Sequence, residues 1–353
     1  MVRIKFSIIL SLFLAATGLY AQQYPVYTQY FFNEYMVNSA VAGTEDYTPI
    51  RLTYRDQWSG FTDSKGDNVA PKTLALSAHT PLTDNMAVGG FVYSDKTGPI
   101  TQTASQFSIG WRACLSKQSC FWDRKKFISL SLGARAIQFA YDDLATTNYN
   151  EYFGLEQDPI LLNITETDFL LNFTVASYFY TEYLYAGFSG QNLFSRALKV
   201  ETNPDFENIM SPEYNVVVGA YIPVSEDKAF AVEPSILTKT TDWSGTQIDI
   251  STRVIYLDNV WAGLSYRTAQ NAYAFMFGLD FGDNMFLGYS YDTSVDGISG
   301  YSNGSHEIAF GMKLSTLFSV ENVRLKSRFK NRRMLLNPFR REGNRTDRRG
   351  SGS

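Results

Sequence analysis

Only two histidines occur in the 353 residues, His79 and His306. His306 stands between Ser305 and Glu307, and a serine, a histidine and a carboxylate are the residue types that acyl-transfer enzymes use. The surrounding segment alternates as a β-strand does, and adjacent strand side chains point to opposite faces. His306 therefore cannot share a site with its two neighbours. The sequence also lacks a nucleophile elbow, a metal-ligand cluster and a phosphate loop, so we expect no enzyme and no cofactor.

A second set of residues, all charged, lies on the polar faces of the predicted strands. The set is Arg51, Arg55, Arg112, Arg135, Glu233, Lys239, Asp249, Arg253, Arg267, Asp280, Asp292 and Glu307. Two interpretations stay open: an ion or solute pathway, or a salt-bridged network that fills a lumen and makes it rigid. Because buried charges are tolerated when they are paired, we favour the network.

These charges are positioned by strands. In the segment 272–281, Tyr273, Phe275 and Phe277 share one face, whereas the alternate positions are mostly small. Apolar residues at every second position indicate β-strands. The same alternation predicts fourteen strands, beginning near residue 48 and continuing near 72–81, 85–94, 103–115, 126–139, 168–180, 183–191, 212–222, 228–239, 246–256, 260–268, 272–281, 285–292 and 305–314. We expect an irregularity such as a bulge at Pro234, because proline cannot donate to a strand ladder.

Composition favours a membrane barrel over a soluble protein. Aromatic residues make up 15% of the chain and charged residues only 19%, whereas soluble domains carry about a quarter charged residues. After the N-terminus no apolar run reaches the ~18 residues of a spanning helix. Aromatic faces that alternate with polar ones are typical of outer-membrane barrels. We therefore expect an all-β protein: a transmembrane, antiparallel, up-and-down β-barrel in a bacterial outer membrane. A soluble secreted β-protein is less favoured, since its aromatic faces would meet water.

The connections between the predicted strands differ at the two ends of the barrel. After every second strand the connection is short, except at 116–125. The other connections are mostly longer and fall at 59–71, 95–102, 140–167, 192–211, 240–245, 269–271 and 293–304. Short periplasmic turns and long extracellular loops are the pattern of these barrels. The pattern places the long loops outside the cell and both termini in the periplasm.

The chain divides into four regions. Residues 1–21 resemble a signal peptide, because Arg3 and Lys5 precede an apolar core and a small-residue cleavage site. Residues 22–47 are aromatic without clean periodicity, and three readings stay open: a lumen plug, a lumen-lining segment or an N-terminal strand. Residues 48–314 form the predicted barrel, and residues 315–353 form a tail.

The two cysteines, Cys114 and Cys120, flank a polar turn. In an oxidising periplasm they can form a disulfide, and two free thiols are the alternative. A pair without a neighbouring His or further Cys is a poor metal site.

The tail is strongly basic. Residues 315–353 carry 11 Lys and Arg against 3 Asp and Glu, a net charge of +8, whereas residues 22–314 carry a net charge of −14. Nucleic acid is not expected in the periplasm, so anionic outer-membrane lipid, an acidic or cell-wall-linked protein and a solvated disordered tail remain as readings. We favour a protein partner because apolar residues interrupt the charges. The predicted contact residues are Arg328, Lys330, Arg332, Arg333, Leu335, Leu336, Phe339, Arg340 and Arg341.

A succession of short motifs runs through the chain. They are Thr28-Gln29-Tyr30-Phe31-Phe32-Asn33, Val37-Asn38-Ser39-Ala40-Val41-Ala42-Gly43, Tyr54-Arg55-Asp56-Gln57-Trp58-Ser59-Gly60-Phe61, Pro71-Lys72-Thr73, Ser77-Ala78-His79-Thr80-Pro81-Leu82, Leu287-Gly288-Tyr289-Ser290-Tyr291-Asp292 and His306-Glu307-Ile308. Over residues 22–314 their order resembles the PorP/SprF family of outer-membrane proteins, which is associated with type IX secretion and gliding motility. Ser39 and Val41 depart from the family's usual proline and aromatic residue, and the basic tail is not part of its general pattern.

The resemblance implies a non-enzymatic barrel that links the outer membrane to periplasmic secretion or gliding apparatus, or holds exported proteins such as adhesins at the surface. It gives structural roles to Arg55, Gln57, Trp58, His79, Tyr289, Tyr291, Asp292, His306 and Glu307. We expect Arg55, Trp58, His79 and His306 near the extracellular strand ends, where they staple the rim or contact cargo, and we favour the staple. The alternative function is an outer-membrane transporter for apolar or small solutes, with residues 22–47 plugging the lumen.

Overall fold

The computed structural model describes residues 27–45, 47–62, 66, 68–83, 85–98, 100–115, 126–141, 168–194, 196–197, 209–224, 229–241, 245–257, 259–281, 284–294 and 300–314. The predicted signal peptide, the basic tail with its contact residues, Cys120 and most of the two longest predicted loops lie outside the described residues. The predictions made for them stay predictions.

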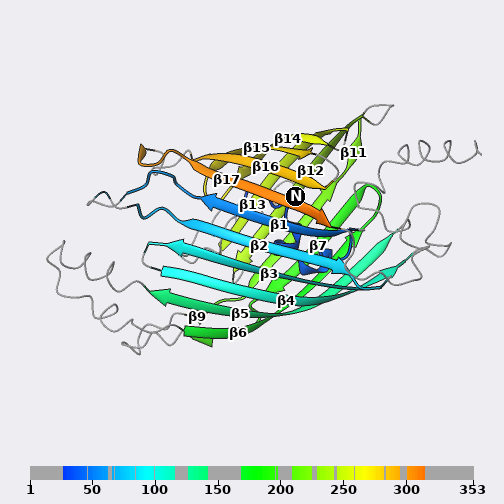
Figure 1. Ribbon diagram of the computed structural model, residues 1–353, viewed down its shortest axis with the longest axis horizontal. Helices are drawn as coiled ribbons and strands as arrows, with labels where there is room; N and C mark the ends of the chain where they lie inside the picture. Colours follow the sequence, from blue (N-terminus) through cyan, green and yellow to red (C-terminus); the bar gives the residue numbers. More distant parts are fainter. Residues whose placement is uncertain are drawn as a thin grey trace, which may run out of the picture.

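Fourteen antiparallel strands form one closed β-barrel, which confirms the predicted fold (Figure 1). The strands are β1 (Thr48–Asp56), β2 (Lys72–Pro81), β3 (Met86–Thr97), β4 (Ile100–Cys114), β5 (Phe127–Tyr141), β6 (Asp168–Tyr180), β7 (Leu184–Gln191), β10 (Glu213–Ala220) continued by β11 (Ile222–Pro223), β12 (Phe230–Thr241), β13 (Gly245–Tyr256), β14 (Val260–Arg267), β15 (Ala272–Phe281), β16 (Met285–Ser294) and β17 (Ser305–Leu314). Two further short strands, β8 (Arg196–Ala197) and β9 (Ile209–Met210), pair with each other between β7 and β10. Helix α2 (Glu34–Val37) and the 3-10 helix η1 (Ser39–Val41) precede β1.

The first and last strands close the barrel. Thr48 pairs with Leu314, and the register continues to Asp56 opposite His306. The other strands pair with their neighbours in sequence, so the topology is up-and-down. A closed barrel leaves no sheet edge unpaired, which satisfies the backbone polar groups in a lipid environment. No helix in the described part of the chain is long and apolar enough to cross a membrane.

The barrel has two distinct ends. The turn end carries the connections after β2, β4, β6, β11, β13 and β15, and the loop end carries the connections after β1, β3, β5, β7, β12, β14 and β16. The predicted longer connection at 95–102 is wrong, because β3 runs to Thr97 and β4 begins at Ile100. The polar residues there resemble a loop in sequence, yet they extend two strands that meet at Gly98, whose φ is +56°.

Pro234 leaves its own strand, β12, continuous but interrupts the pairing of β12 with the preceding strand. It pairs with Thr252 in the continuous register of β12 and β13, so no bulge is present there. Pairing of β12 with the preceding strand stops after Gly219 opposite Ser235 and resumes at Ile222 opposite Val232, in the same register. The unpaired positions are Ala220 and Tyr221, opposite Pro234 and Glu233, so the interruption begins at the proline, which lacks an N–H to donate.

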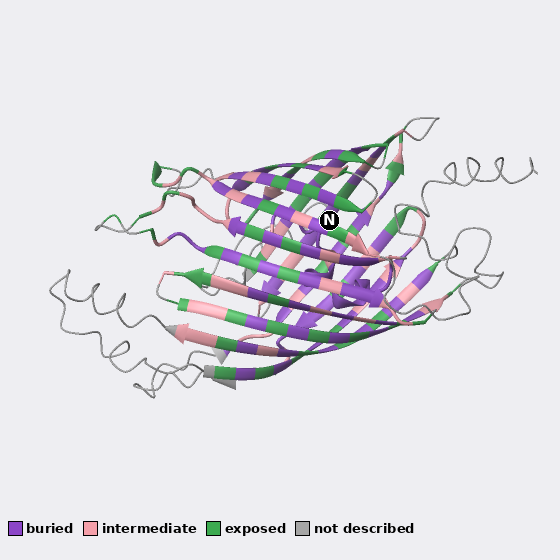
Figure 2. Cartoon of the chain, in the orientation of Figure 1, coloured by how far each residue is buried: buried purple, intermediate pink, exposed green. Residues whose placement is uncertain are grey.

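Burial alternates along the strands (Figure 2). The outward residues are large and apolar, for example Leu132, Phe107 and Phe275, which are all more than half exposed. The inward residues are small, polar or charged, and many are fully buried. An apolar outer surface around a polar interior is the arrangement of a barrel in lipid.

Residues 27–45, called the N-terminal segment below, lie inside the barrel and run from one end to the other. Tyr27 lines a cavity with Tyr93 and Gln191, which lie near the loop end of β3 and β7. Gly43 lies against Pro81 and Ala87, which flank the β2–β3 turn at the turn end. Tyr27 and Leu314 therefore lie at opposite ends of the barrel. The prediction that both termini are periplasmic concerns residues outside the described part.

Candidate functional site

Inward charges from five strands form a buried cluster at the loop end, called the anchor cluster below. Arg55 donates to Asp292 at 2.7 Å and to Glu307 at 3.2 Å. Arg267 lies 3.1 Å from Asp292 and 3.9 Å from Asp249. None of the five is more than 4% exposed. Strand alternation turns all five side chains inward, where each compensates charges that water cannot reach.

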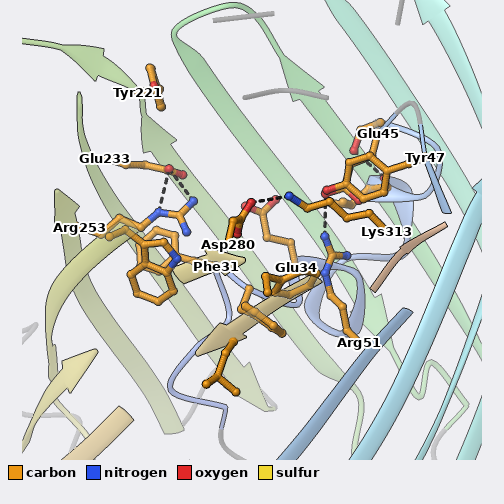
Figure 3. A pocket seen from close by; sticks show the side chains of 16 residues that line it. Phe31, Glu34, Glu45, Tyr47, Arg51, Tyr221, Glu233, Arg253, Asp280 and Lys313 are labelled. Atoms are coloured by element: carbon orange, nitrogen blue, oxygen red, sulfur yellow. Dashed lines mark hydrogen bonds and ion pairs between the residues drawn. The ribbon is translucent and has the colours of Figure 1, made fainter. Parts of the chain in front are cut away.

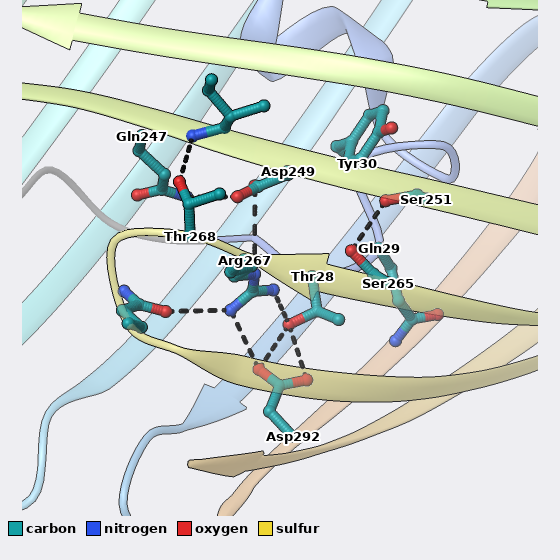
Figure 4. Close-up of polar contacts among 12 residues, drawn as sticks. Thr28, Gln29, Tyr30, Gln247, Asp249, Ser251, Ser265, Arg267, Thr268 and Asp292 are labelled. Carbon is teal, nitrogen blue, oxygen red and sulfur yellow. Dashed lines mark hydrogen bonds and ion pairs between the residues drawn. The ribbon is translucent and has the colours of Figure 1, made fainter. Parts of the chain in front are cut away.

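The anchor cluster holds the start of the N-terminal segment (Figure 4). The backbone N–H groups of Thr28 and Gln29 donate to the two carboxylate oxygens of Glu307, at 2.8 and 3.0 Å. The Thr28 hydroxyl donates to Asp292 at 2.7 Å and accepts hydrogen bonds from Arg55 and Arg267. Hydrogen bonds to charged groups contribute about 1.5–3 kcal/mol each. This contact therefore fixes the segment to the barrel wall.

The middle of the N-terminal segment contacts the opposite side of the wall. Tyr35 and Ser108 are joined by a 2.6 Å hydrogen bond, as are Ser39 and Ser131. A Cβ on the inward-facing Gly89 would lie 2.7 Å from the Tyr35 ring, so glycine is what lets this ring approach the wall.

The turn end fixes the other end of the segment. Arg51 binds Glu45 at 2.7 Å and lies 3.3 Å from the His79 imidazole. The backbone N–H of Gly43 donates to His79 at 3.4 Å, and Arg112 donates to the Gly43 carbonyl. The segment is thus bound by charged side chains at both ends of the lumen.

A third buried pair supports the aromatic part of the segment. Arg253 donates to Glu233 at 3.0 and 2.7 Å, and both residues are at most 2% exposed. The guanidinium carbon of Arg253 lies 4.7 Å from the ring centroid of Phe31 and 5.3 Å from that of Trp261. Cation–π contacts are stronger when they are desolvated, so Arg253 holds Phe31 of the segment against the wall.

A cavity of about 740 Å³, a volume that includes open solvent, lies beside these groups (Figure 3). Its lining joins the N-terminal segment to the turn end of the wall, and it includes the pairs Arg51–Glu45, Arg253–Glu233 and Lys313–Asp280. Figure 3 shows these pairs around the cavity, with Phe31 between them. Six of the seven charged side chains in the lining are therefore paired with one another, and the seventh, Glu34, accepts a hydrogen bond from Tyr178 at 3.2 Å.

The family-motif residues separate into two groups. Arg55, Asp292 and Glu307 meet in the anchor cluster, and Trp58 lies close by, donating its backbone N–H to Ser305 at 3.0 Å. The expectation that His79 shares this rim is wrong. β2 runs from the loop end to the turn end, and His79 lies near its last residue, so it is at the turn end.

The remaining motif residues lie near the loop end. His306 bonds the outward-facing Tyr289 at 2.8 Å and packs against Tyr291, whose hydroxyl donates to the Asn303 carbonyl at 3.2 Å. The backbone N–H of Gln57 donates to the Pro71 carbonyl at 2.9 Å across the base of the β1–β2 connection. These contacts join neighbouring strands at the rim.

Neighbouring side chains on β17 point to opposite faces of the wall, as predicted for Ser305, His306 and Glu307. Ser305 and Glu307 are buried inside, whereas His306 faces outward. Among the described residues, no group of three or more His, Cys, Asp or Glu could hold a metal ion. Cys114, at the end of β4, is disulfide-bonded.

The sequence pattern did not predict which residues of the N-terminal segment contact the wall. Thr28, Gln29 and Glu45 supply the contacts at its two ends. The only sequence signal for the first two was their place in the first family motif, since the segment has no periodicity to reveal which side chains face the wall.

Comparisons with known proteins give a family match and distant structural likenesses. The model of a family described as type IX secretion system membrane protein PorP/SprF matches residues 19–312. No curated protein sequence matches the chain. Similar solved structures include the CymD monoaromatic hydrocarbon channel, with a TM-score of 0.42 and 12% identity over 80% of this chain and 91% of that one. For BamA from Haemophilus ducreyi lacking POTRA domains 1–3 the TM-score is 0.39, with 9% identity over 76% of this chain and 70% of that one. For the KdgM porin the TM-score is 0.34, with 6% identity over 76% of this chain and 98% of that one.

Proposed function

We propose, from the premise that this chain belongs to the PorP/SprF family of type IX secretion system membrane proteins, that the barrel serves secretion as an attachment point and not as an open channel. It links the outer membrane to periplasmic secretion or gliding apparatus, or holds exported proteins at the surface. It acts through protein contacts and performs no catalysis.

The observation that carries this proposal is the fixed N-terminal segment. Carboxylates bind its backbone near Thr28, and the Arg51–Glu45 pair binds it at the other end. The hydrogen bonds of Thr28 and Gln29 to Glu307 and the ion pair of Glu45 with Arg51 would have to break before the segment could leave the lumen. The buried charges left behind would lose these partners, which is costly. A lumen filled in this way supports a closed, rigid body rather than a conduit.

The basic tail supplies the periplasmic contact in this proposal. The barrel's last strand ends at the turn end, from which residues 315–353 continue. Short connections at that end support a periplasmic orientation. The tail's net charge of +8 suits an acidic partner, and its Met334, Leu335, Leu336 and Phe339 add apolar contact.

The experiment is a detergent pull-down from native membranes with the full chain and with a chain that ends at Leu325, followed by mass spectrometry. We expect secretion-apparatus proteins to co-purify with the full chain and the periplasmic ones to be lost from the shortened chain. A matched control keeps the tail's length but carries R332Q, R333Q, R340Q and R341Q. Normal secretion by the shortened chain would refute the docking role of the tail.

A transporter for apolar or small solutes is the second candidate. The cavity at the turn end supports it, because Phe31, Trp261 and Phe286 contribute aromatic lining. This candidate predicts a solute or lipid that co-purifies inside the barrel and is lost when Trp261 is replaced by alanine. The attachment role predicts an empty cavity and unchanged partner binding in that variant.

A further inference from the structure

Two lysines lie side by side on the outer surface near the loop end. Lys72 on β2 and Lys96 on β3 are direct cross-strand partners, and both side chains are exposed. Within the described residues neither ammonium has an ion-pair partner. Asp56, the cross-strand partner of Lys72 on its other side, makes no ion pair with it. Two unpaired cations therefore occupy opposed positions on one face.

An external anion would stabilise this arrangement. Like charges that face each other across strands destabilise a sheet, and no carboxylate of the described wall neutralises these two. A single group with more than one negative charge, placed between them from outside, would convert the repulsion into two favourable contacts. The lysine stems are long and flexible enough to converge on such a group.

The neighbouring side chains indicate what else that ligand carries. Towards the turn end, the same outer face continues with Leu74, Leu76 and Val92, each 42–48% exposed. These residues form an apolar strip that begins next to Lys72 on β2, whereas on β3 Ser94 lies between Lys96 and Val92. The anionic group that binds the lysines is therefore joined to hydrocarbon chains, as in a lipid.

Hydroxyl groups lie beside the lysine pair and in the row next to it towards the turn end, where Ser94 is the cross-strand partner of Leu74. Lys96 is opposite Thr101, and the next outward pair along β3 and β4 is Ser94 opposite Thr103. A row of hydroxyls beside two cations offers hydrogen bonds to sugar hydroxyls and phosphate oxygens together. A glycerophospholipid with one phosphate would use less of this surface than a phosphorylated glycolipid.

We propose that Lys72 and Lys96 bind the phosphate groups of a phosphorylated glycolipid of the outer leaflet, with its acyl chains on the Leu74–Leu76–Val92 strip and its sugars beside Thr101, in the row of the lysines. The site is formed by the outer wall, separate from the filled lumen. It fixes the height and the orientation of the barrel in the membrane. It also places one glycolipid on the β2–β3 side of the molecule.

The test measures binding of diphosphoryl lipid A to the purified full chain in detergent, by native mass spectrometry. The variant is K72Q/K96Q, and the matched control is K126Q, which removes an exposed lysine at the turn end. Each basic residue near an anionic lipid surface is worth about a factor of five in affinity, so the double variant should bind about thirty-fold more weakly. Lipid A stripped of its phosphates should bind the native chain equally weakly.

Three results would overturn the proposal. Equal binding by K72Q/K96Q and the native chain would show that the lysines do not hold the ligand. An equal loss in K126Q would show a general charge effect. Phosphatidylglycerol that binds as tightly as lipid A, with the same loss in K72Q/K96Q, would identify a phospholipid instead. The heat-dependent electrophoretic shift of the folded barrel checks that each variant folds, and the pull-down partners should be unchanged.

Discussion

Replacing Glu307 with alanine should loosen the N-terminal segment without opening the barrel wall. The change removes both carboxylate acceptors of the Thr28 and Gln29 N–H groups and one of the two acidic partners of Arg55. Each lost hydrogen bond to a charged group is worth about 1.5–3 kcal/mol, so the segment should lose about 3–6 kcal/mol of attachment. The strand register of β17 is formed by backbone groups and should persist.

Hydrogen exchange in detergent measures this attachment. Amides of α2 and η1 report the opening of the segment, and a loss of about 3–6 kcal/mol should speed their exchange by about 10²- to 10⁴-fold. The matched control is Thr73→Val, which removes a 2.5 Å hydrogen bond to Asp95 within the wall next to Arg55 and leaves both carboxylate acceptors of the Thr28 and Gln29 N–H groups in place. Exchange in E307A that equals the native rate, or that rises equally in T73V, would refute the reasoning.

Two further variants test the packing of the interior by the midpoint of heat-dependent electrophoretic mobility. Gly89→Ala should destabilise the folded barrel by about 1–3 kcal/mol, because the new Cβ would lie 2.7 Å from Tyr35, whereas Gly110→Ala, with its nearest neighbour at 3.7 Å, should be tolerated; equal midpoints would exclude the close contact. Arg253→Met should cost about 3–5 kcal/mol because it leaves Glu233 charged and unpaired in the interior, and E233L in the same chain should recover much of that loss. No recovery would mean that Arg253 acts mainly through its aromatic contacts.

The strands were predictable because their pattern is local. Alternation of large outward residues such as Phe275 with small inward ones is set by the two-residue period of a strand, and it gave all fourteen strands within a few residues. The predicted strand boundaries are wrong where the alternation of apolar and small residues ends. Asp95 and Lys96 resemble a loop because they lie beyond the apolar band, yet the backbone there still pairs.

The path of the N-terminal segment could not be read from the sequence. Its α2 helix has four residues, too few for a periodic face. Its contacts are extremely non-local: Thr28 and Glu307 are 279 positions apart. The inward charges themselves were predictable, but which of them pair depends on the register around the whole barrel. His79 was misplaced for the related reason that successive strands reverse direction, so two motifs close in sequence lie at opposite ends.

The central claim is that the N-terminal segment keeps the lumen closed, and single-channel recording in planar bilayers tests it most directly. The native chain should show no steady conductance, whereas E307A should show openings that the T73V control lacks. A steady ohmic conductance of the native chain, equal to that of E307A, would contradict the account and favour a transporter.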